Sequence, residues 1–561
     1  MVKGQTDKRS KIPAGLRTLP FVSSLRTLTV RRPSGHRRQV LLLALILSLP
    51  SLYCLLFIPP LWRDSDGFLQ VFTKPSYLTI LHWPPLYCFG ARVPLLFGNL
   101  LDPGFLSHFP PRQPVVFTDP GVYALLLAQH AALILACLGA CRTFTTRPLL
   151  QCGFAAAFAL SPALYAFANC VGSESLSHTL LIWTVVAAAR LKQAPDPNRH
   201  LTYLWALTSA ILARHINALA GLLLPVQAGL EGVGKVFSRL PAPGPAAGPR
   251  AAMVAASKRL AASLALSAAA FLIAQGIMYV LCAGTGTVWV SRLGYTFQWR
   301  LDFFTGLPAA ERRAFLADLD KRLNDPLIST GLAAVESAFD RQDPFDPERL
   351  FTAMYDRLAD QGIKSTGARR DLIDRKLNRL AQTVLLSADR RFWGVVTGDF
   401  LASLDYSLPQ MAAEPFRSTD WLKDRLGQPT FEPLRSLVTF RNAQRTEEKW
   451  QNSAYFQLGA GIPVWTFGVA ALVGCALSAL KAGREETPWP ALSFSLALLL
   501  TGAALLYANC ALTFRGARFV PPAYVLFLLA AMAGFGAWSD RFGSVRQPDV
   551  AARSADPAGN D

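Results

Sequence analysis

Apolar segments of about 20 residues recur along this chain and are separated by stretches rich in polar and charged residues. A helix rises 1.5 Å per residue, so a segment of this length crosses a hydrocarbon core of about 30 Å. The sequence contains such segments at 39–58, 121–141, 150–169, 175–190, 201–230, 259–281, 459–480, 489–510 and 520–538. This pattern predicts an all-α polytopic membrane protein.

The segment 201–230 is too long for one crossing and carries Arg214 at its centre. The loop that follows, 231–259, holds five Lys or Arg against one acid. A single crossing would place this basic loop outside, against the tendency of basic loops to stay in the cytoplasm. We therefore expect a hairpin of two short helices, 201–213 and 216–230. The hairpin brings the total to about ten transmembrane helices, with both termini cytoplasmic.

Composition and charge agree with a membrane protein and argue against nucleic-acid binding. Of the 561 residues, 52% are hydrophobic and 17% are charged, whereas soluble domains average roughly 25% charged residues. The net charge is +19, but residues 1–38 alone hold ten Lys or Arg against one acid. The largest hydrophilic stretch, 283–458, has 24 basic and 23 acidic residues. No basic face is therefore predicted there, and we expect no nucleic-acid partner.

These patterns divide the chain into a membrane part and an outer insert. None of the nine cysteines falls in 283–458, so an outer domain held by disulfides is excluded. We expect a basic cytoplasmic tail at 1–38, an N-terminal membrane module at 39–282 with its first outer loop at 60–120, an extracytoplasmic insert at 283–458, C-terminal membrane helices at 459–538 and a cytoplasmic tail at 539–561.

The insert has the periodicity of helices. Asp346 and Pro347 are typical of a helix start, and apolar residues then repeat at helical spacing until Gly362. A second helix is predicted from about residue 367. The insert is therefore expected to be a small all-α subdomain, and it carries no catalytic signature.

The first outer loop begins with charged residues at the membrane surface: Arg63, Asp64 and Asp66 directly follow the first apolar segment. A carboxylate there can accept a proton from an attacking hydroxyl, or it can hold a divalent cation such as Mg²⁺ or Mn²⁺. The alternative is a hydrated loop in which Arg63 pairs with the neighbouring acids.

Two further outer segments carry candidate binding residues. His82 and Tyr87 flank Pro84 and Pro85, which break any helix, so the sequence predicts an interfacial re-entrant or surface segment. Glu174 lies in the short turn before the segment 175–190. It is either an acid favoured at a helix N-terminus or a second acid that faces the same outer cavity as Asp64 and Asp66.

Two arginines, Arg515 and Arg518, precede the last membrane helix on the predicted outer face. Guanidinium groups match the oxygens of a phosphate, so these side chains are candidate phosphate ligands. The alternative is that they only extend to the membrane interface. Because cations on the outer side oppose the positive-inside tendency, their presence favours a functional role.

Taken together, these motifs resemble the bacterial polyprenyl-phosphate-dependent GT-C glycosyltransferases, a family that includes the aminoarabinose and protein-mannosyl transferases. The resemblance covers about residues 39–230 and 505–538 and leaves the insert out. The motifs that carry it are Asp64-Ser65 through Phe68, Pro84-Pro85-Leu86-Tyr87, Ser161-Pro162, Ser173-Glu174-Ser175-Leu176 and Arg518-Phe519-Val520-Pro521.

The resemblance implies an enzyme that transfers a sugar from a polyprenyl-phosphate donor to an acceptor on a lipid-linked glycan or a protein, at the outer face. The family's catalytic acid would fall on Asp64 or Asp66, with the spacing favouring Asp64 as general base in a single inverting displacement. Arg515 or Arg518 would hold the leaving phosphate.

The same resemblance implies roles for the other candidate residues. Glu174 would be a second acid, as a metal ligand with Asp64 and Asp66 or as a hydrogen-bond partner of the substrate. Arg214 is a further candidate for the phosphate, and the candidate substrate contacts are Arg63, His82 and Tyr87.

Two departures from the family pattern affect the donor sugar. Phe68 and Phe519 stand where family members often have Tyr, so two hydroxyl contacts are missing and the donor sugar stays open. The abundance of Ala, and of Arg over Lys, is typical of a bacterium and places the protein in the inner membrane, with the site facing the periplasm or exterior. The alternatives are a transporter or flippase and an envelope assembly protein.

Overall fold

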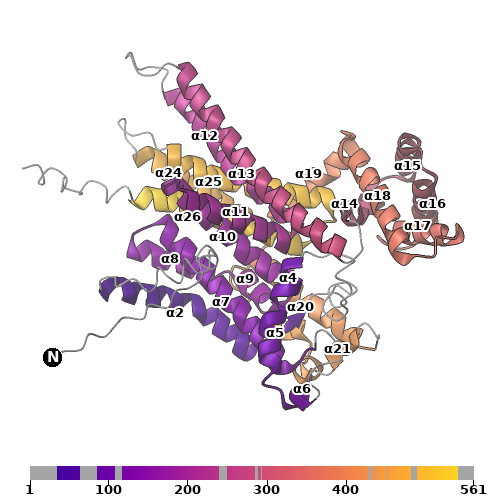
Figure 1. Ribbon diagram of the computed structural model, residues 1–561, viewed down its shortest axis with the longest axis horizontal. Coiled ribbons are helices and arrows are strands. Elements are labelled where there is room, and N and C mark those ends of the chain that lie inside the picture. Colours follow the sequence, from indigo (N-terminus) through magenta and orange to yellow (C-terminus); the bar gives the residue numbers. More distant parts are fainter. Residues whose placement is uncertain are drawn as a thin grey trace, which may run out of the picture.

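The protein is almost entirely helical (Figure 1). The structure is a computed structural model that describes residues 34–62, 85–107, 116–238, 249–284, 289–291, 293–427, 431–435, 437–451, 453–481 and 489–540. Within these ranges the strands are the two-residue β1 (Leu61–Trp62) and β2 (Cys170–Val171). The all-α prediction is therefore confirmed.

A bundle of long helices forms the larger part of the protein. Its elements are α2 (Ser34–Phe57), α7 (Asp119–Phe144), α8 (Pro148–Ala159), α9 (Pro162–Ala168), α10 (Ser173–Gln193), α11 (Pro197–Ala213), the 3-10 helix η3 (His215–Leu222), α12 (Leu223–Ser238), α13 (Pro249–Gly284), α24 (Trp465–Lys481), α25 (Trp489–Leu512), η6 (Ala517–Phe519) and α26 (Pro521–Asp540).

Six helical stretches in the described residues are long and apolar enough to cross a membrane. They are Arg37–Phe57, Asp119–Phe144, His215–Gly234, Met253–Gly284, Leu492–Leu512 and Pro521–Asp540. Helices α8 and α9 together make a seventh, bent by 61° at the break before Pro162. The protein is therefore a polytopic membrane protein, although fewer than the predicted ten spans are evident by length and composition.

Proline sets where several bundle helices begin. Pro148, Pro162 and Pro197 each stand in the first turn of a helix, where no intrahelical partner for the missing N–H is needed. Asp196 caps α11 by accepting a hydrogen bond from the N–H of Arg199 (2.9 Å). The starts of α8 and α11 lie within four residues of the predicted 150 and 201, whereas Pro162 starts a second helix inside the predicted single segment 150–169.

Close helix packing around α26 forms the centre of the bundle. The apolar stretch of α26 is the most buried of the six, with 83% of its residues inside the protein. A Cβ added at Gly474 of α24 would lie 2.9 Å from the backbone N of Phe535, so these two helices pack almost backbone to backbone. Small residues allow such close approach between membrane helices.

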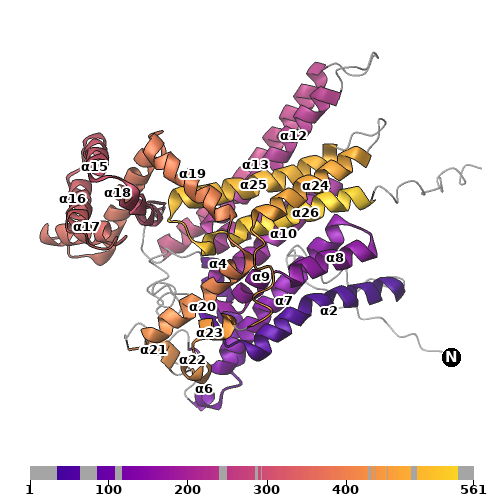
Figure 2. The same cartoon turned by 180° about the vertical axis from the view of Figure 1, so that it is seen from behind.

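Polar contacts at one end of the bundle join helix termini that are far apart in the sequence. The pairs are Gln39–Gln151 (2.6 Å), Thr143–Gln193 (3.1 Å), Thr145–Asp540 (2.7 Å) and Lys192–Glu231 (3.2 Å). Figures 1 and 2 show the start of α2 and the end of α26 at this end, and the insert on the opposite side. These contacts therefore hold together the end of the bundle at which the described part of the chain starts and finishes (Figures 1 and 2).

The chain reverses at Arg214, as predicted. Helix α11 begins at the end of the bundle that holds the termini, where Arg199 Nη1 donates to the carbonyl oxygen of Arg190 (2.7 Å). Helix α12 returns to that end with Glu231. Between them, Arg214 pairs with Glu174 in the first turn of α10, at the opposite end.

The first loop, predicted at 60–120, contains three short helices: α4 (Pro85–Gly90), α5 (Arg92–Asn99) and α6 (Pro103–Ser107). Helix α4 begins at the second proline of the Pro84-Pro85 pair, as expected of a residue that fits the first turn. Large apolar side chains on these helices stay exposed, among them Val93 at 57% and Leu101 at 75%. This surface agrees with the predicted interfacial segment.

The stretch 283–458 divides into two parts that pack differently. The first part has its own apolar core and comprises α14 (Leu293–Phe297), η4 (Gln298–Gly306), α15 (Ala309–Leu323), α16 (Pro326–Asp340), α17 (Arg349–Asp360), α18 (Thr366–Leu385) and α19 (Arg390–Leu404). We call this part the insert domain. The predicted helices after Pro347 and from about 367 correspond to α17 and α18, with α17 beginning at Arg349.

The second part belongs to the bundle instead. It comprises α20 (Leu408–Asp424), α21 (Glu432–Arg435), α22 (Val438–Asn442) and α23 (Thr446–Gln451). Buried residues of α20, including Met411 and Phe416, share the core of the bundle helices. The sequence predicted a single subdomain for the whole stretch because both parts are helical and hydrophilic on their outer faces.

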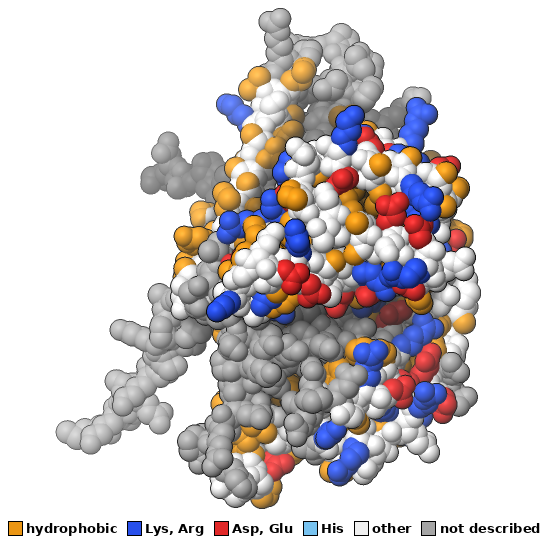
Figure 3. Space-filling view, turned by 90° about the vertical axis from the view of Figure 1, so that its right-hand side faces the viewer, with side chains coloured by type: hydrophobic (Ala, Val, Ile, Leu, Met, Phe, Trp, Pro, Cys, Tyr) orange, Lys and Arg blue, Asp and Glu red, His pale blue; other side chains and the backbone are white. Residues whose placement is uncertain are grey.

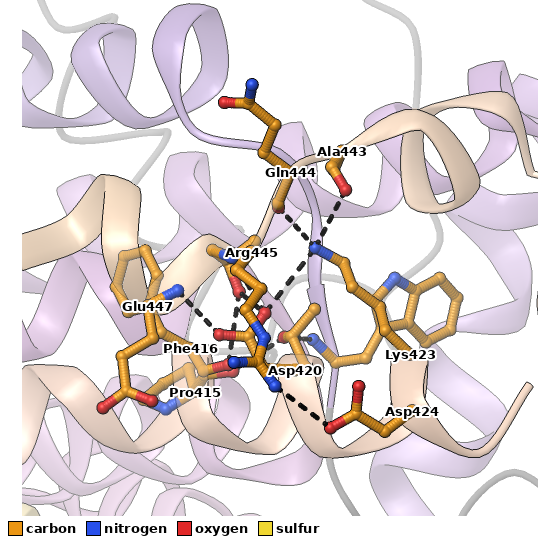
Figure 4. Close-up of polar contacts among 12 residues, drawn as sticks. Pro415, Phe416, Asp420, Lys423, Asp424, Ala443, Gln444, Arg445 and Glu447 are labelled. Carbon is orange, nitrogen blue, oxygen red and sulfur yellow. Dashed lines mark hydrogen bonds and ion pairs between the residues drawn. The ribbon is translucent and has the colours of Figure 1, made fainter.

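Asp420 fastens α20 to α23 (Figure 4). Its carboxylate accepts hydrogen bonds from the N–H of Thr446 (2.8 Å), from the Thr446 hydroxyl (2.7 Å) and from the N–H of Glu447 (2.7 Å). Lys423 donates to the carbonyl oxygen of Gln444 (2.7 Å) and lies 3.6 Å from Asp420. These bonds cap the start of α23 and hold the segment after α22 in place.

Charges of both signs are mixed over the surface at this end of the protein. Figure 3 shows Lys and Arg side chains interspersed with Asp and Glu on the face that carries the insert domain. On that face no large patch of a single sign is visible among the coloured residues. A strongly basic surface of the kind that binds nucleic acid is thus not seen on this face.

A buried ion pair holds the first turns of the insert domain against α19. Arg300 is fully buried, and its Nη1 lies 2.7 Å from Asp399 and 3.4 Å from Asp302. Burial and, to a smaller extent, the Asp399 carboxylate raise the pKa of Asp302 to about 6, although Arg300 acts in the opposite direction. Asp302 therefore titrates near pH 6 in the folded protein.

We predict that Gly294→Ala destabilises the insert domain. A Cβ at this position would overlap the backbone of Leu377 and Asn378 in α18, so α14 and α18 would have to separate. The thermal unfolding midpoint of the purified protein and its protection from protease measure the effect. Gly394→Ala is the matched control, because its Cβ would meet no atom within 4 Å and alanine favours a helix; equal behaviour of both variants would contradict the prediction.

We predict that the insert domain becomes less stable as pH rises from 4 to 7. The pKa of Asp302 is raised from 3.8 to about 6 by folding, so the folded state binds this proton more tightly and its stabilisation is lost as pH rises through about 6. The pH dependence of the unfolding midpoint measures this slope. Asp302→Asn should flatten it, whereas Asp343→Asn, whose pKa is lowered by Arg349, should leave the fall in place.

Candidate functional site

Two segments 109 positions apart in the sequence meet at the end of the bundle opposite the described termini (Figure 1). Strand β1 pairs in parallel with β2, with Leu61 opposite Cys170 and Trp62 opposite Val171. The N–H of Leu61 donates to the carbonyl oxygen of Asn169 (3.0 Å), and Asn169 Nδ2 donates to the carbonyl oxygen of Pro59 (3.1 Å). The pairing brings the start of the acidic first loop beside the turn that leads to Glu174.

The side chain of Gln129, in α7, bonds the backbone of the turn between α9 and α10. Its Nε2 donates to the carbonyl oxygens of Ala168 (2.8 Å) and Cys170 (3.0 Å), and its Oε1 accepts from the hydroxyl of Tyr87 (2.8 Å). Burial raises the pKa of Tyr87 well above its usual range, with smaller contributions from groups that include Cys170 and Glu174. Tyr87, a predicted substrate contact, is thus a buried neutral donor that helps to position the turn.

Glu174 and Arg214 form a buried ion pair at the same place. Arg214 Nη1 lies 3.4 Å from Glu174 Oε1, and the side chains are 19% and 4% exposed. Glu174 stands in the first turn of α10, where a negative charge is favoured. Arg214 is the extended residue between α11 and η3, with φ −154° and ψ 128°. Two residues that the sequence analysis named separately are therefore direct partners.

Asn217 supports the break at Arg214. Its Nδ2 donates to the carbonyl oxygen of Ala210 and to the hydroxyl of Ser177, both at 2.9 Å. The N–H of Asn217 donates to the carbonyl oxygen of Arg214 (3.0 Å). The amide thus satisfies a carbonyl at the end of α11 and ties the turn to α10.

His178 belongs to this site and was missed by the sequence analysis. It lies one helical turn after Glu174 on α10, is 2% exposed, and packs edge-on against Phe167 with ring centres 5.2 Å apart. Neither of its ring nitrogens has a hydrogen-bond partner in the described part of the chain. The spacing of four residues between Glu174 and His178 was the available signal, because such residues share one helix face.

Arg515 and Arg518 lie in the connection between α25 and α26, and each has an aromatic ring beside it. The guanidinium of Arg515 is 5.3 Å from the centre of the Tyr406 ring, and that of Arg518 is 4.6 Å from Phe519. Asn509 Nδ2 donates to the carbonyl oxygen of Phe519 (3.2 Å), which fixes this connection to the end of α25. Arg515 is exposed and Arg518 is half-buried.

Helix α20 runs between the two groups of candidate residues. Near its far end, the Thr419 hydroxyl accepts a hydrogen bond from the N–H of Trp62 (2.7 Å), at the root of the acidic loop. Its first residue, Leu408, follows Tyr406, whose ring lies against Arg515. The rise of the helix between Leu408 and Thr419 is about 17 Å. The connection that carries the two arginines and Trp62, which precedes the acidic loop, are therefore farther apart than the two partners of an ion pair.

The structure describes five of the nine predicted site residues. Arg63, Asp64, Asp66 and His82 lie outside the described residues. Of the others, Glu174, Arg214 and Tyr87 come together around the β1–β2 pairing, while Arg515 and Arg518 lie in the connection after α25.

The described residues do not build a metal site. No group of three or more His, Cys, Asp or Glu side chains in the described ranges could hold a metal ion. Glu174, the one member of the predicted metal set within these ranges, has the cation of Arg214 beside it, and a positive charge opposes a second cation. We therefore derive no step through a metal.

Comparison with known proteins adds no assignment: no family model matches this chain, and no curated protein matches it either.

We predict that Arg214→Met destabilises the protein by up to about 3 kcal/mol, because a buried carboxylate loses its Arg214 partner. Adding Glu174→Gln should restore much of the loss, since the double variant leaves no unmatched charge. Thermal unfolding in detergent measures both changes. The control is Arg199→Met, whose partner Asp196 is 43% exposed and whose effect should stay below about 1 kcal/mol. A double variant no more stable than Arg214→Met would contradict the prediction.

Proposed function

We propose that this protein is a membrane glycosyltransferase of the GT-C type. It would transfer a sugar from a polyprenyl-phosphate donor to an acceptor on a lipid-linked glycan or protein, on the outer face of a bacterial inner membrane. The observation that carries the proposal is the meeting of β1, β2 and the Glu174–Arg214 pair at the bundle end opposite the described termini. In the sequence, Asp64 follows Trp62, the last residue of β1, by two positions.

The proposed topology has ten membrane helices. Helices α10, α11 and α24 would add to the six apolar spans and to the bent pair α8–α9. Polar residues of α10, Glu174 and His178 among them, lower its mean hydropathy, yet both are buried inside the protein and need not meet lipid. A helix of this kind can cross the membrane within a bundle.

The proposed reaction is a single displacement at the anomeric carbon. Asp64 takes the proton of the acceptor hydroxyl as its oxygen forms a bond to that carbon. The bond between the carbon and the phosphate oxygen breaks on the opposite face, so the configuration inverts. The electron pair leaves with the phosphate, whose growing charge Arg515 and Arg518 stabilise.

The remaining groups would serve the substrate or the site itself. Glu174, in its pair with Arg214, would set the shape of the site at the β1–β2 pairing. His178, buried one turn further along α10, offers one donor and one acceptor to a sugar or acceptor hydroxyl. The Phe residues at positions 68 and 519 leave the identity of the donor sugar open.

A transporter or flippase is the main alternative. Coupled transporters commonly place ionisable residues in broken helices near the middle of the membrane. Here the buried pair joins the first turn of α10 to the residue that ends α11, at one end of the bundle. This position favours chemistry at the membrane surface over a site in the middle of the membrane.

We predict that Asp64→Asn lowers sugar transfer by about 10²- to 10⁴-fold, the usual contribution of a general base. The purified protein is assayed with a panel of radiolabelled polyprenyl-phosphate sugars and bacterial membrane acceptors. Asp360→Asn, an exposed acid of the insert domain, is the control and should retain wild-type turnover.

Three outcomes decide between the hypotheses. Loss in Asp66→Asn with full activity in Asp64→Asn would move the base to Asp66. Full activity in both variants would remove the proposed mechanism. Movement of a lipid-linked sugar across vesicles without any transfer would establish the transporter alternative.

A further inference from the structure

The insert domain and the residue that follows it contact the arginine connection between α25 and α26 at two separate points. The ring of Trp299, in η4, lies 5.9 Å from the ring of Phe514. The ring of Tyr406, just after α19, lies 5.3 Å from the guanidinium of Arg515. In each contact, one partner lies in the connection, which belongs to the part of the chain that resembles GT-C enzymes. The other partner, Trp299 or Tyr406, lies outside that part.

Tyr406 is held firmly in place by its backbone. Its carbonyl oxygen accepts a hydrogen bond from the N–H of Val464 (3.0 Å), at the start of α24. The next residue, Ser407, forms an isolated bridge with Pro463 and a capping box with Gln410 at the start of α20. The backbone that carries the Tyr406 ring is therefore held against the bundle at the start of α24 and at the start of α20.

Trp299 reaches Arg518 through a second aromatic ring. Phe514, which Trp299 contacts, lies 5.3 Å from the guanidinium of Arg518 and 5.7 Å from the ring of Phe519. Arg518 is thus flanked by two rings, one of which is backed by the insert domain. A displacement of Trp299 would be transmitted to Arg518 through Phe514.

The insert domain is itself anchored beside this connection. The neighbouring residue of Trp299, Arg300, is fully buried and pairs with Asp399 of α19. Helix α19 in turn packs on α25, where the rings of Trp393 and Tyr507 lie parallel with centres 6.0 Å apart. The insert domain is therefore attached to α25, the helix after which the arginine connection begins, and Trp299 belongs to this domain.

We infer that the two phosphate-binding arginines are positioned from outside their connection: Arg518 by the insert domain, through Trp299 and Phe514, and Arg515 by Tyr406, in the segment that joins the insert domain to α20. The ligand affected is the phosphate group of a polyprenyl phosphate. This inference rests on the proposed function, because it assumes that these arginines bind the donor. Tyr406 and Trp299 are positioning residues that act through the arginines and do not touch the reacting atoms.

The test measures binding of undecaprenyl phosphate to the full-length protein, with undecaprenol as a probe that lacks only the phosphate. Tyr406→Leu removes the ring beneath Arg515 and should weaken binding of the phosphate by about 2- to 30-fold, the range expected for a cation–π contact. Binding of undecaprenol should not change. Tyr406→Phe keeps the ring and should bind both probes as the wild type does.

Tyr355→Leu is the matched control. It removes the same kind of ring from beneath Arg369 (4.1 Å) within the insert domain, away from the arginine connection. It should leave binding of both probes unchanged even where it lowers the unfolding midpoint. Equal weakening by Tyr355→Leu and Tyr406→Leu would mean that the loss reflects instability alone and would overturn the inference.

A double variant separates the inference from the proposed function. If Tyr406 acts through Arg515, Tyr406→Leu should have no further effect on binding once Arg515→Ala is present. Weak binding in Arg515→Ala with normal binding in Tyr406→Leu would overturn the positioning role and leave the proposed phosphate site standing. Normal phosphate binding in Arg515→Ala, in Arg518→Ala and in their double variant would overturn both.

Discussion

Backbone groups where helices break inside a membrane protein must find partners within the protein, because lipid offers none. Three breaks in this bundle, after Phe57, after Ala168 and after Ala213, meet at one end, and side-chain amides serve all three. Asn169 and Gln129 bond the carbonyls around β1 and β2, and Asn217 bonds the end of α11. The positions of Tyr87, Glu174 and Arg214 follow from this shared arrangement.

The buried pair of Glu174 and Arg214 depends on the same arrangement. Each residue stands at a helix end that the amides hold in place, so the two charges meet without rearrangement. Burial of an ion pair adds little net stability, since desolvation offsets much of the attraction, but loss of one partner is costly. A pair of this kind fixes which helix ends are neighbours, and it makes the shape of the site beside Trp62 specific.

Much of the bundle could be predicted from local signals. Apolar length predicted the helices, and the charge of the loop after residue 230 predicted the reversal at Arg214. The pairing of Trp62 with Val171 could not be predicted, because two-residue strands have no periodicity and their contact spans 109 positions. The attachment of α20 to the bundle was missed for a related reason: a face that packs on a membrane bundle resembles a face that packs on an insert. His178 was within reach, four residues after Glu174, yet a lone histidine in an apolar segment is typical of a packed core.

The arginines differ in whether their guanidinium groups are already paired with a carboxylate, and this difference indicates which of them suit a phosphate. Arg214 is half-buried and pairs with the buried Glu174, so binding a phosphate would require it to leave a carboxylate behind, at a cost of about 3 kcal/mol or more. Arg515 is exposed, and within the described residues its guanidinium lies over an aromatic ring rather than against a carboxylate. The edge of a guanidinium carries the N–H donors that match phosphate oxygens. Arg214 is therefore better suited to shaping the site, and the connection after α25 is better suited to holding a departing phosphate.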